Sequence, residues 1–333
     1  MPDCVAILCS GQGPQHAGMF ALTGDAPEAA GLFAHAATLL GGRDAREIVR
    51  TETSEALHHN GIGQILCSLQ ALAAAAALRD EMPDRLIVAG YSVGEVAAWG
   101  VAGLLSMTDT LDLVARRAEA MDAAASPGEG LLFVRGLCRE VVDTLCQRHD
   151  AAIAIVEPGG AFILGGSRAA LQALAAEAKA MDATRVVGVP VEVASHTKRL
   201  ARASAEFRKF VSHVRVQLPP IARTRLLSGV DGSPVIDVEA GLDKLAAQIS
   251  QTVQWADCLQ GCMEAGAITF LELGPGSALS HMVAGAYPDV SARSLEDFKT
   301  LQGARVWLAH TQVAKSLSIH PRAMKMGIRS SAL

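Results

Sequence analysis

The five residues Gly90-Tyr91-Ser92-Val93-Gly94 constrain the fold more than any other feature of the sequence. They follow a short apolar run at 85–89 and precede a segment of helical composition that begins at Glu95. A strand that passes into a helix through such a turn is typical of an α/β fold, and the turn is so sharp that its flanking positions cannot hold a side chain. The serine hydroxyl then lies at the sheet edge, where the helix directs its free N–H groups. We predict that Ser92 is a nucleophile; a solvated serine in a glycine-rich turn is the alternative.

The rest of the chain alternates strand-like and helix-like segments, which also favours an α/β fold. Continuous apolar runs predict buried strands, and apolar residues at helical spacing predict helices. The predicted strands outside the middle of the chain are 4–9, 85–89 and 268–273. The predicted helices there are 61–80, 95 onward, 106–122, 197–212, 242–249 and 277–286.

The segment from 131 to 191 has a different order of elements. Its pattern reads strand, helix, strand, strand, helix, strand, which is the βαββαβ order of a ferredoxin-like domain. Ser126-Pro127-Gly128 and Pro190 bracket the segment. We therefore predict a large, discontinuous α/β catalytic domain at 1–126 and 197–311, with a small ferredoxin-like domain inserted at 127–196. The last residues, 312–333, lose periodicity and are predicted to form a mobile tail.

Composition excludes several classes of protein. Lys plus Arg total 29 and Asp plus Glu total 34, which gives a net charge of -5, whereas a general nucleic-acid or anionic-membrane binder needs a basic surface. The N-terminus lacks a signal-peptide pattern, and the longest apolar stretch, 96–105, is shorter than a membrane span. The seven cysteines include no pair at zinc-site spacing. We expect a cytoplasmic protein that holds no metal and binds neither nucleic acid nor membrane.

A nucleophilic serine needs a base, and His196 is the best candidate among the ten histidines. It lies where a predicted strand gives way to a predicted helix, in Ser195-His196-Thr197. Loops at such junctions collect the functional groups of α/β sheets. The other nine histidines lie in polar or helical stretches and are interpreted as surface residues.

Arg117 is unusual because of the helix face on which it lies. It is spaced by four residues from Leu113 and from Met121, so it projects along the apolar face of the predicted helix 106–122. A guanidinium that points inward must meet an anion. That anion is either a carboxylate of the protein or one that a ligand brings.

Eight basic residues lie within 198–225, and the same segment contains one acid, Glu206. This local positive charge suggests docking of an acidic partner or of coenzyme phosphates, for which we name Lys198, Arg199 and Arg202. An ordinary solvated helix face is the alternative interpretation.

Several short motifs together resemble a known family. The motifs occur in the order and spacing of malonyl-CoA:acyl-carrier-protein transacylases, and the resemblance spans residues 4–300. They are Gly11-Gln12-Gly13, Gly90-Tyr91-Ser92-Val93-Gly94-Glu95, Arg117, Ser195-His196, Gln248 with Val253-Gln254-Trp255, and Gly274-Pro275-Gly276. The resemblance implies an α/β-hydrolase-like core with a parallel sheet and an inserted ferredoxin-like domain. More narrowly, the segments 7–13, 90–95 and 131–136 are similar to the epsilon subunit of bacterial malonate decarboxylase, which loads malonyl groups onto that complex's own carrier protein.

The resemblance also implies a role for each site residue. Ser92 would be the nucleophile and His196 its general base, oriented by the main-chain carbonyl of Gln248. The N–H groups of Gln12 and Val93 would form the oxyanion hole. Arg117 would bind the free carboxylate of the malonyl group in a bidentate clamp.

The implied substrates and partners follow from the same resemblance. Malonyl-CoA would give its malonyl group to the thiol of a phosphopantetheine-type arm on an acyl carrier protein, and no cofactor would be bound. Other malonate decarboxylase subunits would be further partners, whereas a transacylase of fatty-acid or polyketide synthesis would use a different carrier. Two other classes stay open. One is a serine hydrolase or thioesterase, which predicts an acid between Ser92 and a late histidine in the sequence and gives Arg117 no task. The other is a scaffold that only binds acylated carrier.

Two residues depart from the family pattern. Tyr91 stands where synthesis-type transacylases have histidine, and Glu157 lies in a turn where the family commonly has asparagine. An acid at position 157 is expected to repel a malonyl carboxylate, so this edge of the site differs from the family pattern.

Overall fold

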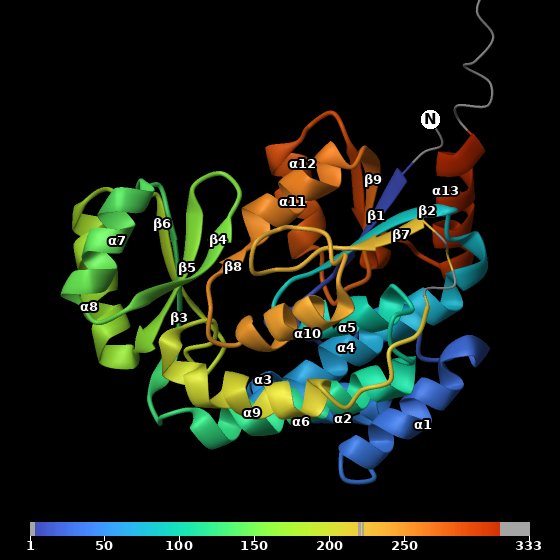
Figure 1. Ribbon diagram of the computed structural model, residues 1–333, viewed down its shortest axis with the longest axis horizontal. Helices are drawn as coiled ribbons and strands as arrows, with labels where there is room; N and C mark the ends of the chain where they lie inside the picture. Colours follow the sequence, from blue (N-terminus) through green and yellow to red (C-terminus); the bar gives the residue numbers. More distant parts are fainter. Residues whose placement is uncertain (1–3, 219–220, 222, 314–333) are drawn as a thin grey trace, which may run out of the picture.

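The computed structural model describes residues 4–218, 221 and 223–313, which form two five-stranded sheets side by side (Figure 1). The first sheet has the order β10-β9-β1-β2-β7, and every neighbouring pair is parallel. Its strands are β1 (Cys4–Cys9), β2 (Arg85–Gly90), β7 (Arg223–Leu226), β9 (Ala267–Glu272) and β10 (Ser291–Ser294). The predicted α/β fold with a parallel sheet is thus confirmed.

The central strands of the first sheet are apolar because helices cover both of their faces. All six residues of β1 are buried. Helix α5 packs on β1 and β2, with α4 and α6 behind it, whereas α11 and α12 pack against β9 (Figure 1). The loops after β1 and β2 therefore meet at the carboxyl edge of the sheet, where α/β folds bind ligands.

The helices of the first half are α1 (Ala30–Leu39), α2 (Ala45–Thr51), α3 (Ser54–His58), α4 (Asn60–Ala77), α5 (Gly94–Val101) and α6 (Met107–Ala124). Those of the second half are α7 (Arg139–Arg148), α8 (Arg168–Ala180), α9 (Ala201–Val211), α10 (Val238–Ala247), α11 (Trp255–Glu264), α12 (Ala278–Ala286) and α13 (Leu301–Val313). Short 3-10 turns are η1 (Pro27–Ala29), η2 (Arg79–Glu81), η3 (Lys198–Leu200) and η4 (Leu295–Asp297). Each helix predicted from spacing is present within a few residues of its predicted bounds.

The second sheet has the order β6-β3-β5-β4-β8. Its strands are β3 (Glu129–Arg135), β4 (Ala152–Glu157), β5 (Ala161–Ser167), β6 (Arg185–Val189) and β8 (Val253–Gln254). The elements from β3 to β6 follow the predicted βαββαβ order, with antiparallel pairing between β3, β4, β5 and β6. Figure 1 shows α7 and α8 on the outer side of this sheet.

Strand β8 was not predicted from the sequence; it pairs in parallel with β4 although it comes from a segment far along the chain. The edge strands β7 and β10 were not predicted either. The proposed division at 127–196 therefore contains four of the five strands described for this sheet. In the predicted tail, residues 314–333 lie outside the described residues.

Helix α4 is long and apolar enough to cross a membrane by length and composition alone. Its 18-residue window is 83% buried inside the protein, where it packs against α5 and α6. A helix covered in this way is a core helix, and its alanines at 71 and 73–77 allow close packing against its neighbours.

Candidate active site

The turn that carries Ser92 requires glycine on both sides. A Cβ on Gly90 would lie 2.1 Å from the carbonyl oxygen of Gly94, and a Cβ on Gly94 would lie 2.1 Å from that of Cys9. Ser92 itself has a φ of 55°, a left-handed conformation that costs about 1–3 kcal/mol for a residue with a side chain. The structure thus confirms the predicted strand–turn–helix geometry, which directs the serine side chain away from the sheet.

Ser92, His196 and Gln248 form a continuous chain of hydrogen bonds. The Oγ of Ser92 lies 2.8 Å from Nε2 of His196, and Nδ1 of His196 lies 2.6 Å from the main-chain oxygen of Gln248. Because a carbonyl oxygen only accepts, Nδ1 must carry the proton, and Nε2 is left as the acceptor for the serine hydroxyl. The imidazole is therefore in the tautomer that a general base needs.

The backbone also fixes His196. Its amide donates a 2.8 Å hydrogen bond to the carbonyl of Ile249, and its φ of 62° is a second left-handed conformation in the site. The side chain is buried, and burial, with a further contribution from the charge of Arg117, lowers the pKa of His196 to about 3. The imidazole is thus neutral and ready to accept a proton at neutral pH.

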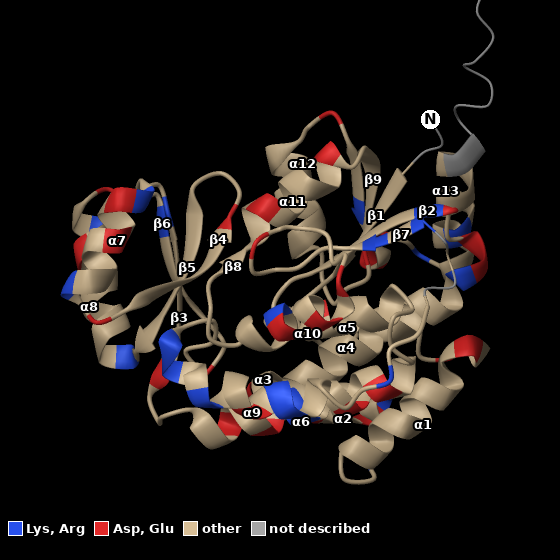
Figure 2. Cartoon of the chain, viewed as in Figure 1, with Lys and Arg blue, Asp and Glu red and all other residues tan. Residues whose placement is uncertain are grey.

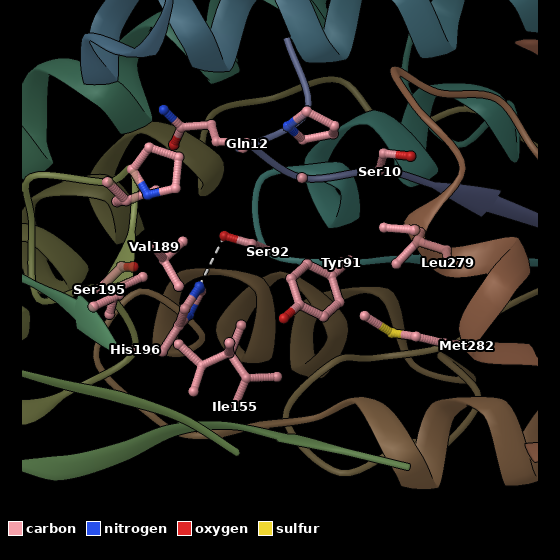
Figure 3. Close-up of a pocket in the computed structure, with 18 of the residues that line it drawn as sticks. Ser10, Gln12, Tyr91, Ser92, Ile155, Val189, Ser195, His196, Leu279 and Met282 are labelled. Carbon is pink, nitrogen blue, oxygen red and sulfur yellow. Dashed lines mark hydrogen bonds between the residues drawn. The ribbon is translucent and has the colours of Figure 1, made fainter. Parts of the chain in front are cut away.

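Ser92 and His196 lie in the wall of a cavity of about 290 Å³ (Figure 3). Its lining comes from the loop after β1, from the second sheet and from α12, and includes Gln12, Tyr91, Ile155, Val189, Leu279 and Met282. Most of these side chains are apolar, whereas the reacting groups are polar. The cavity therefore suits a mainly apolar chain that carries a reactive group at its end.

Arg117 lies fully inside the protein, as its spacing predicted. Its Nη1 donates to Oε1 of Gln64 at 2.7 Å and its Nη2 to Oε1 of Gln248 at 3.2 Å, whereas its Nε has no partner within the described part of the chain. Burial lowers the pKa of Arg117 to about 10, so it stays charged. Arg117 is not in the cavity wall, but Gln248 also donates from Nε2 to the carbonyl of Ser92 at 3.0 Å. The side chain of Gln248 thus contacts both the guanidinium of Arg117 and the backbone of Ser92.

Glu95 is a buried acid for which the sequence indicated no role of its own. Its Oε2 accepts a 2.6 Å hydrogen bond from Nε2 of Gln248, and burial raises its pKa to about 7. The available signal was a charged residue at the start of the otherwise apolar helix α5. Gln64, which contacts Arg117, was also missed because an amide in a helix gives no sequence signal.

The loop that carries Gln12 is held from two sides. Oε1 of Gln15 accepts a hydrogen bond from the amide of Gly13, and Nε2 of His58 lies 2.9 Å from the carbonyl of Gly13. Within the described ranges, the amides of Gln12 and Val93 donate no hydrogen bond, so both are free to act as donors. Gln12 lines the cavity and Val93 directly follows Ser92, which is compatible with the oxyanion-hole role that the resemblance implied.

The named docking residues differ in their surroundings. Arg199 forms ion pairs with Glu129, at 3.4 Å, and with Asp150. Lys198 and Arg202 have no ion-pair partner among the residues that the structure describes. Figure 2 shows basic and acidic residues in this part of the molecule: Lys209 of α9 pairs with Glu206, and Arg208 pairs with Asp243. The local positive charge is therefore partly neutralised, and of the three named docking residues Lys198 and Arg202 are the two without an ion pair in the described part of the chain.

The site lacks two features of other enzyme classes. In the described residues no carboxylate contacts His196, because a main-chain oxygen takes the place that an acid has in a serine hydrolase. The same part of the chain contains no group of three or more His, Cys, Asp or Glu side chains placed to hold a metal ion.

Comparison with known proteins agrees with this geometry. Residues 7–304 match the acyl transferase domain family. The malonyl CoA-acyl carrier protein transacylase of Mycobacterium bovis is 29% identical over 300 residues, which cover 88% of this chain and 96% of the relative. The crystal structure of an acyl-carrier-protein S-malonyltransferase from Burkholderia pseudomallei has a TM-score of 0.82 and 26% identity over 91% of this chain and 99% of that one.

A second solved structure supports the fold alone. It is a malonyl-transacylase in complex with the acyl carrier protein of a type II polyketide system, with a TM-score of 0.83 at 24% identity, covering 91% of this chain and 99% of that one. The match of the family model covers most of this chain, including the turn at Ser92 and the loop at His196. On this match, together with a serine–histidine pair at the carboxyl edge of a parallel sheet, the chain belongs to the acyl transferase domain family.

Proposed function

We propose that this protein transfers a malonyl group from malonyl-CoA to the thiol of an acyl carrier protein through a malonyl ester on Ser92. The observation that carries the proposal is the position of Gln248. Its main-chain oxygen orients His196 toward Ser92, and its side chain contacts the buried guanidinium of Arg117. A nucleophile with its base and a cation for a carboxylate are thus joined through one residue.

In the first half-reaction, Oγ of Ser92 attacks the carbonyl carbon of the thioester while its proton passes to Nε2 of His196. The negative charge that develops on the carbonyl oxygen accepts hydrogen bonds from the amides of Gln12 and Val93. Removing one donor of this kind typically costs about 10²–10³ in rate. The tetrahedral intermediate then collapses: the carbon–sulfur bond breaks, and the coenzyme A thiolate takes the proton from His196.

Arg117 supplies selectivity for an acyl group with a free carboxylate. In the free protein its two N–H contacts are to neutral amide oxygens, those of Gln64 and Gln248. A carboxylate adds its own negative charge to these hydrogen bonds and can accept two N–H groups of one guanidinium side by side, so a malonyl group would replace the amides. A lysine could not offer the same planar pair of donors.

In the second half-reaction the carrier thiol attacks the malonyl ester, and the steps of the first half-reaction run in the opposite direction. Its proton passes to His196, its sulfur attacks the ester carbonyl, and Oγ of Ser92 leaves and takes the proton back. Support for an acyl carrier protein as acceptor comes from the named relatives and from the fold neighbour solved with its carrier. Lys198 and Arg202 are the proposed contacts for an acidic carrier.

We further propose that the carrier is the one that belongs to malonate decarboxylase. The support is the similarity of segments 7–13, 90–95 and 131–136 to the epsilon subunit of that complex, together with tyrosine rather than histidine at position 91. The other subunits of the complex would then be further partners. A carrier from fatty-acid or polyketide synthesis is the alternative acceptor, which the following experiment separates.

Intact-mass spectrometry tests the proposal. The protein is incubated with malonyl-CoA and then with either carrier, each bearing its prosthetic arm. A malonyl adduct on Ser92 that moves to the malonate decarboxylase carrier, and slowly or not at all to a fatty-acid-synthesis carrier, is the expected result. Ser92→Ala is the matched control, since it keeps the fold of the turn and removes the nucleophile.

The other two classes give different results in the same experiment. Stoichiometric release of malonate without any carrier indicates a hydrolase. Binding of acylated carrier with no label on Ser92 indicates a scaffold. Either result overturns the proposed transfer reaction.

A further inference from the structure

Among the residues that the structure describes, Arg117 is a buried cation with no direct carboxylate partner. Only 1% of the residue is exposed, and its two recorded contacts within the described residues are the neutral oxygens of Gln64 and Gln248. A buried charge needs a compensating charge nearby, because burial removes the water that would otherwise stabilise it. The compensating charge must therefore act through one of these amides.

Glu95 provides that charge from the far side of Gln248. Glu95 is also only 1% exposed, and its Oε2 accepts a 2.6 Å hydrogen bond from Nε2 of Gln248. The fold leaves room for this carboxylate: a Cβ on Gly229 would lie 2.5 Å from Oε2 of Glu95. Residue 229 is thus a place where any side chain would displace the acid.

The carboxamide of Gln248 lies between the two charges in one orientation. Its N–H end faces Glu95 and its oxygen faces Arg117, so the amide dipole is aligned with the field between the two charges. The pKa values of the two residues respond to each other: the charge of Arg117 lowers that of Glu95, and the charge of Glu95 raises that of Arg117. This is an ion pair bridged by an amide.

We propose that Glu95 is a positioning residue that tunes acyl-group selectivity. In the free protein it serves, through Gln248, as the counter-charge of Arg117. It thereby limits how tightly Arg117 holds the carboxylate of the acyl group. The inference rests on the proposed function, in which that carboxylate binds Arg117. When the acyl group arrives, two carboxylates share one guanidinium, and each weakens the hold of the other. An acyl group that is held less tightly before transfer leaves more readily with the carrier, since binding energy spent on the ester intermediate slows its next step.

The test is Glu95→Gln, which removes the charge and keeps an oxygen that can accept from Gln248 and from the amide of Gly229. The expected result is that KM for malonyl-CoA falls by about fivefold or more, as the loss of one like charge in a buried site predicts. The kcat for transfer to the carrier does not rise, and KM and kcat for acetyl-CoA stay within about twofold, because acetyl has no carboxylate.

Two further variants keep the inference falsifiable. Gly229→Ala leaves the charge in the chain but displaces the carboxylate, so it is expected to raise the malonyl-to-acetyl ratio of kcat/KM in the same direction as Glu95→Gln. If Glu95→Gln does not fold, Gly229→Ala tests the same prediction by itself. Glu177→Gln on α8 is the matched control, since it neutralises an acid whose partners, Arg148 and His149, lie at the C-terminal end of α7.

The outcomes distinguish failure of the proposed function from failure of the proposed role of Glu95. If the wild-type protein forms no malonyl adduct on Ser92, the proposed function fails. If the adduct forms but Glu95→Gln and Gly229→Ala change malonyl and acetyl kinetics in equal proportion, Glu95 has a structural role alone and the inference is overturned.

Discussion

The hydroxyl of Tyr91 donates a 2.6 Å hydrogen bond to Oε1 of Glu157, so the two residues that depart from the family pattern contact each other. Tyr91 lines the cavity beside Ser92, whereas Glu157, the last residue of β4, is not in the cavity wall. The ring of Tyr91 also packs edge-on against Trp255, with the ring centroids 5.4 Å apart. The expected repulsion between position 157 and a malonyl carboxylate is therefore reduced, since the acid is bonded to a hydroxyl behind the wall.

Removing this hydrogen bond should destabilise the protein. Tyr91→Phe leaves the buried carboxyl of Glu157 without its donor, which is expected to cost about 1–3 kcal/mol in the free energy of unfolding. Glu157→Gln should cost less, because its amide oxygen still accepts from the tyrosine. Denaturant titrations of the three proteins measure the difference, and equal losses in both variants would contradict the interpretation.

Replacing Arg117 should change acyl selectivity rather than general activity. In Arg117→Ala the kcat/KM for malonyl-CoA is expected to fall by about 10²–10³, as for the loss of a buried, hydrogen-bonded charge partner. Transfer of acetyl from acetyl-CoA should be kept or improved. Steady-state kinetics with both donors check this, and a proportional loss for both acyl groups would rule out the carboxylate clamp.

The low pKa of His196 predicts how the protein responds to acid. Since burial lowers the pKa to about 3, the folded protein keeps the imidazole neutral where the unfolded chain, with a value near 6.5, takes up a proton. The stability contributed by the neutral imidazole is therefore complete above about pH 6.5 and is lost as the pH falls towards 3. The rate of malonyl-ester formation should stay free of histidine protonation down to about pH 4.

Two measurements check the response to acid. His196→Ala should lose less stability than the wild type between about pH 6.5 and pH 4, as unfolding titrations would show. Burial raises the pKa of Glu95 to about 7, so its ionisation should give a separate step near neutrality in the profile of activity against pH. The Glu95→Gln variant should lack this step. An activity loss in Glu95→Gln centred near pH 6.5 would mean that His196 titrates normally.

The three named basic residues should not contribute equally to docking. Arg199 already has ion-pair partners in Glu129 and Asp150, so Arg199→Ala is expected to change KM for the carrier little. The double replacement of Lys198 and Arg202 by alanine should raise that KM and weaken its salt dependence. Transfer kinetics at several ionic strengths test this, and an unchanged KM in the double variant would favour an ordinary solvated helix face.

The two glycines of the nucleophile turn should tolerate no side chain. Gly94→Ala places a Cβ 2.1 Å from the carbonyl oxygen of Cys9, so the folded turn cannot form without a shift of the backbone. Gly31→Ala in α1 is the matched control, since its Cβ meets nothing within 4 Å and should stabilise the helix by up to about 1 kcal/mol. Thermal melting of both variants measures the contrast, and a stable Gly94→Ala would mean that β1 and the turn can separate.

Much of the fold was predictable because its signals are local. Apolar runs gave β1, β2 and β9, and helical spacing gave α4 and α6. The strands that were missed have weak local signals: β7 and β10 are short, polar edge strands, and β8 has two residues. Their assignment depends on pairing with strands far away in the sequence, which periodicity does not reveal.

The candidate site also combines residues that were predictable from local sequence with contacts that were not. Ser92 and Arg117 were predicted from local patterns, a glycine-flanked turn and a basic residue on an apolar helix face. The contact of Gln248 with His196 was expected only through the family resemblance, since a main-chain carbonyl has no sequence signature. The links from Gln248 to Glu95 and from Tyr91 to Glu157 join segments more than 60 residues apart, so only the folded structure brings them together.

The pairing of β8 with β4 also limits how this protein can be recombined with its relatives. Val253 and Gln254 complete the edge of the second sheet, and Trp255, the next residue, packs on Tyr91. A chimaera that exchanges only residues 127–196 would join a foreign β4 to the resident β8, and would separate Glu157 from the tyrosine with which it is matched. Exchange of carrier or acyl preference by grafting therefore requires three crossover segments rather than one: the inserted segment, the turn at residue 91 and the stretch around residue 254.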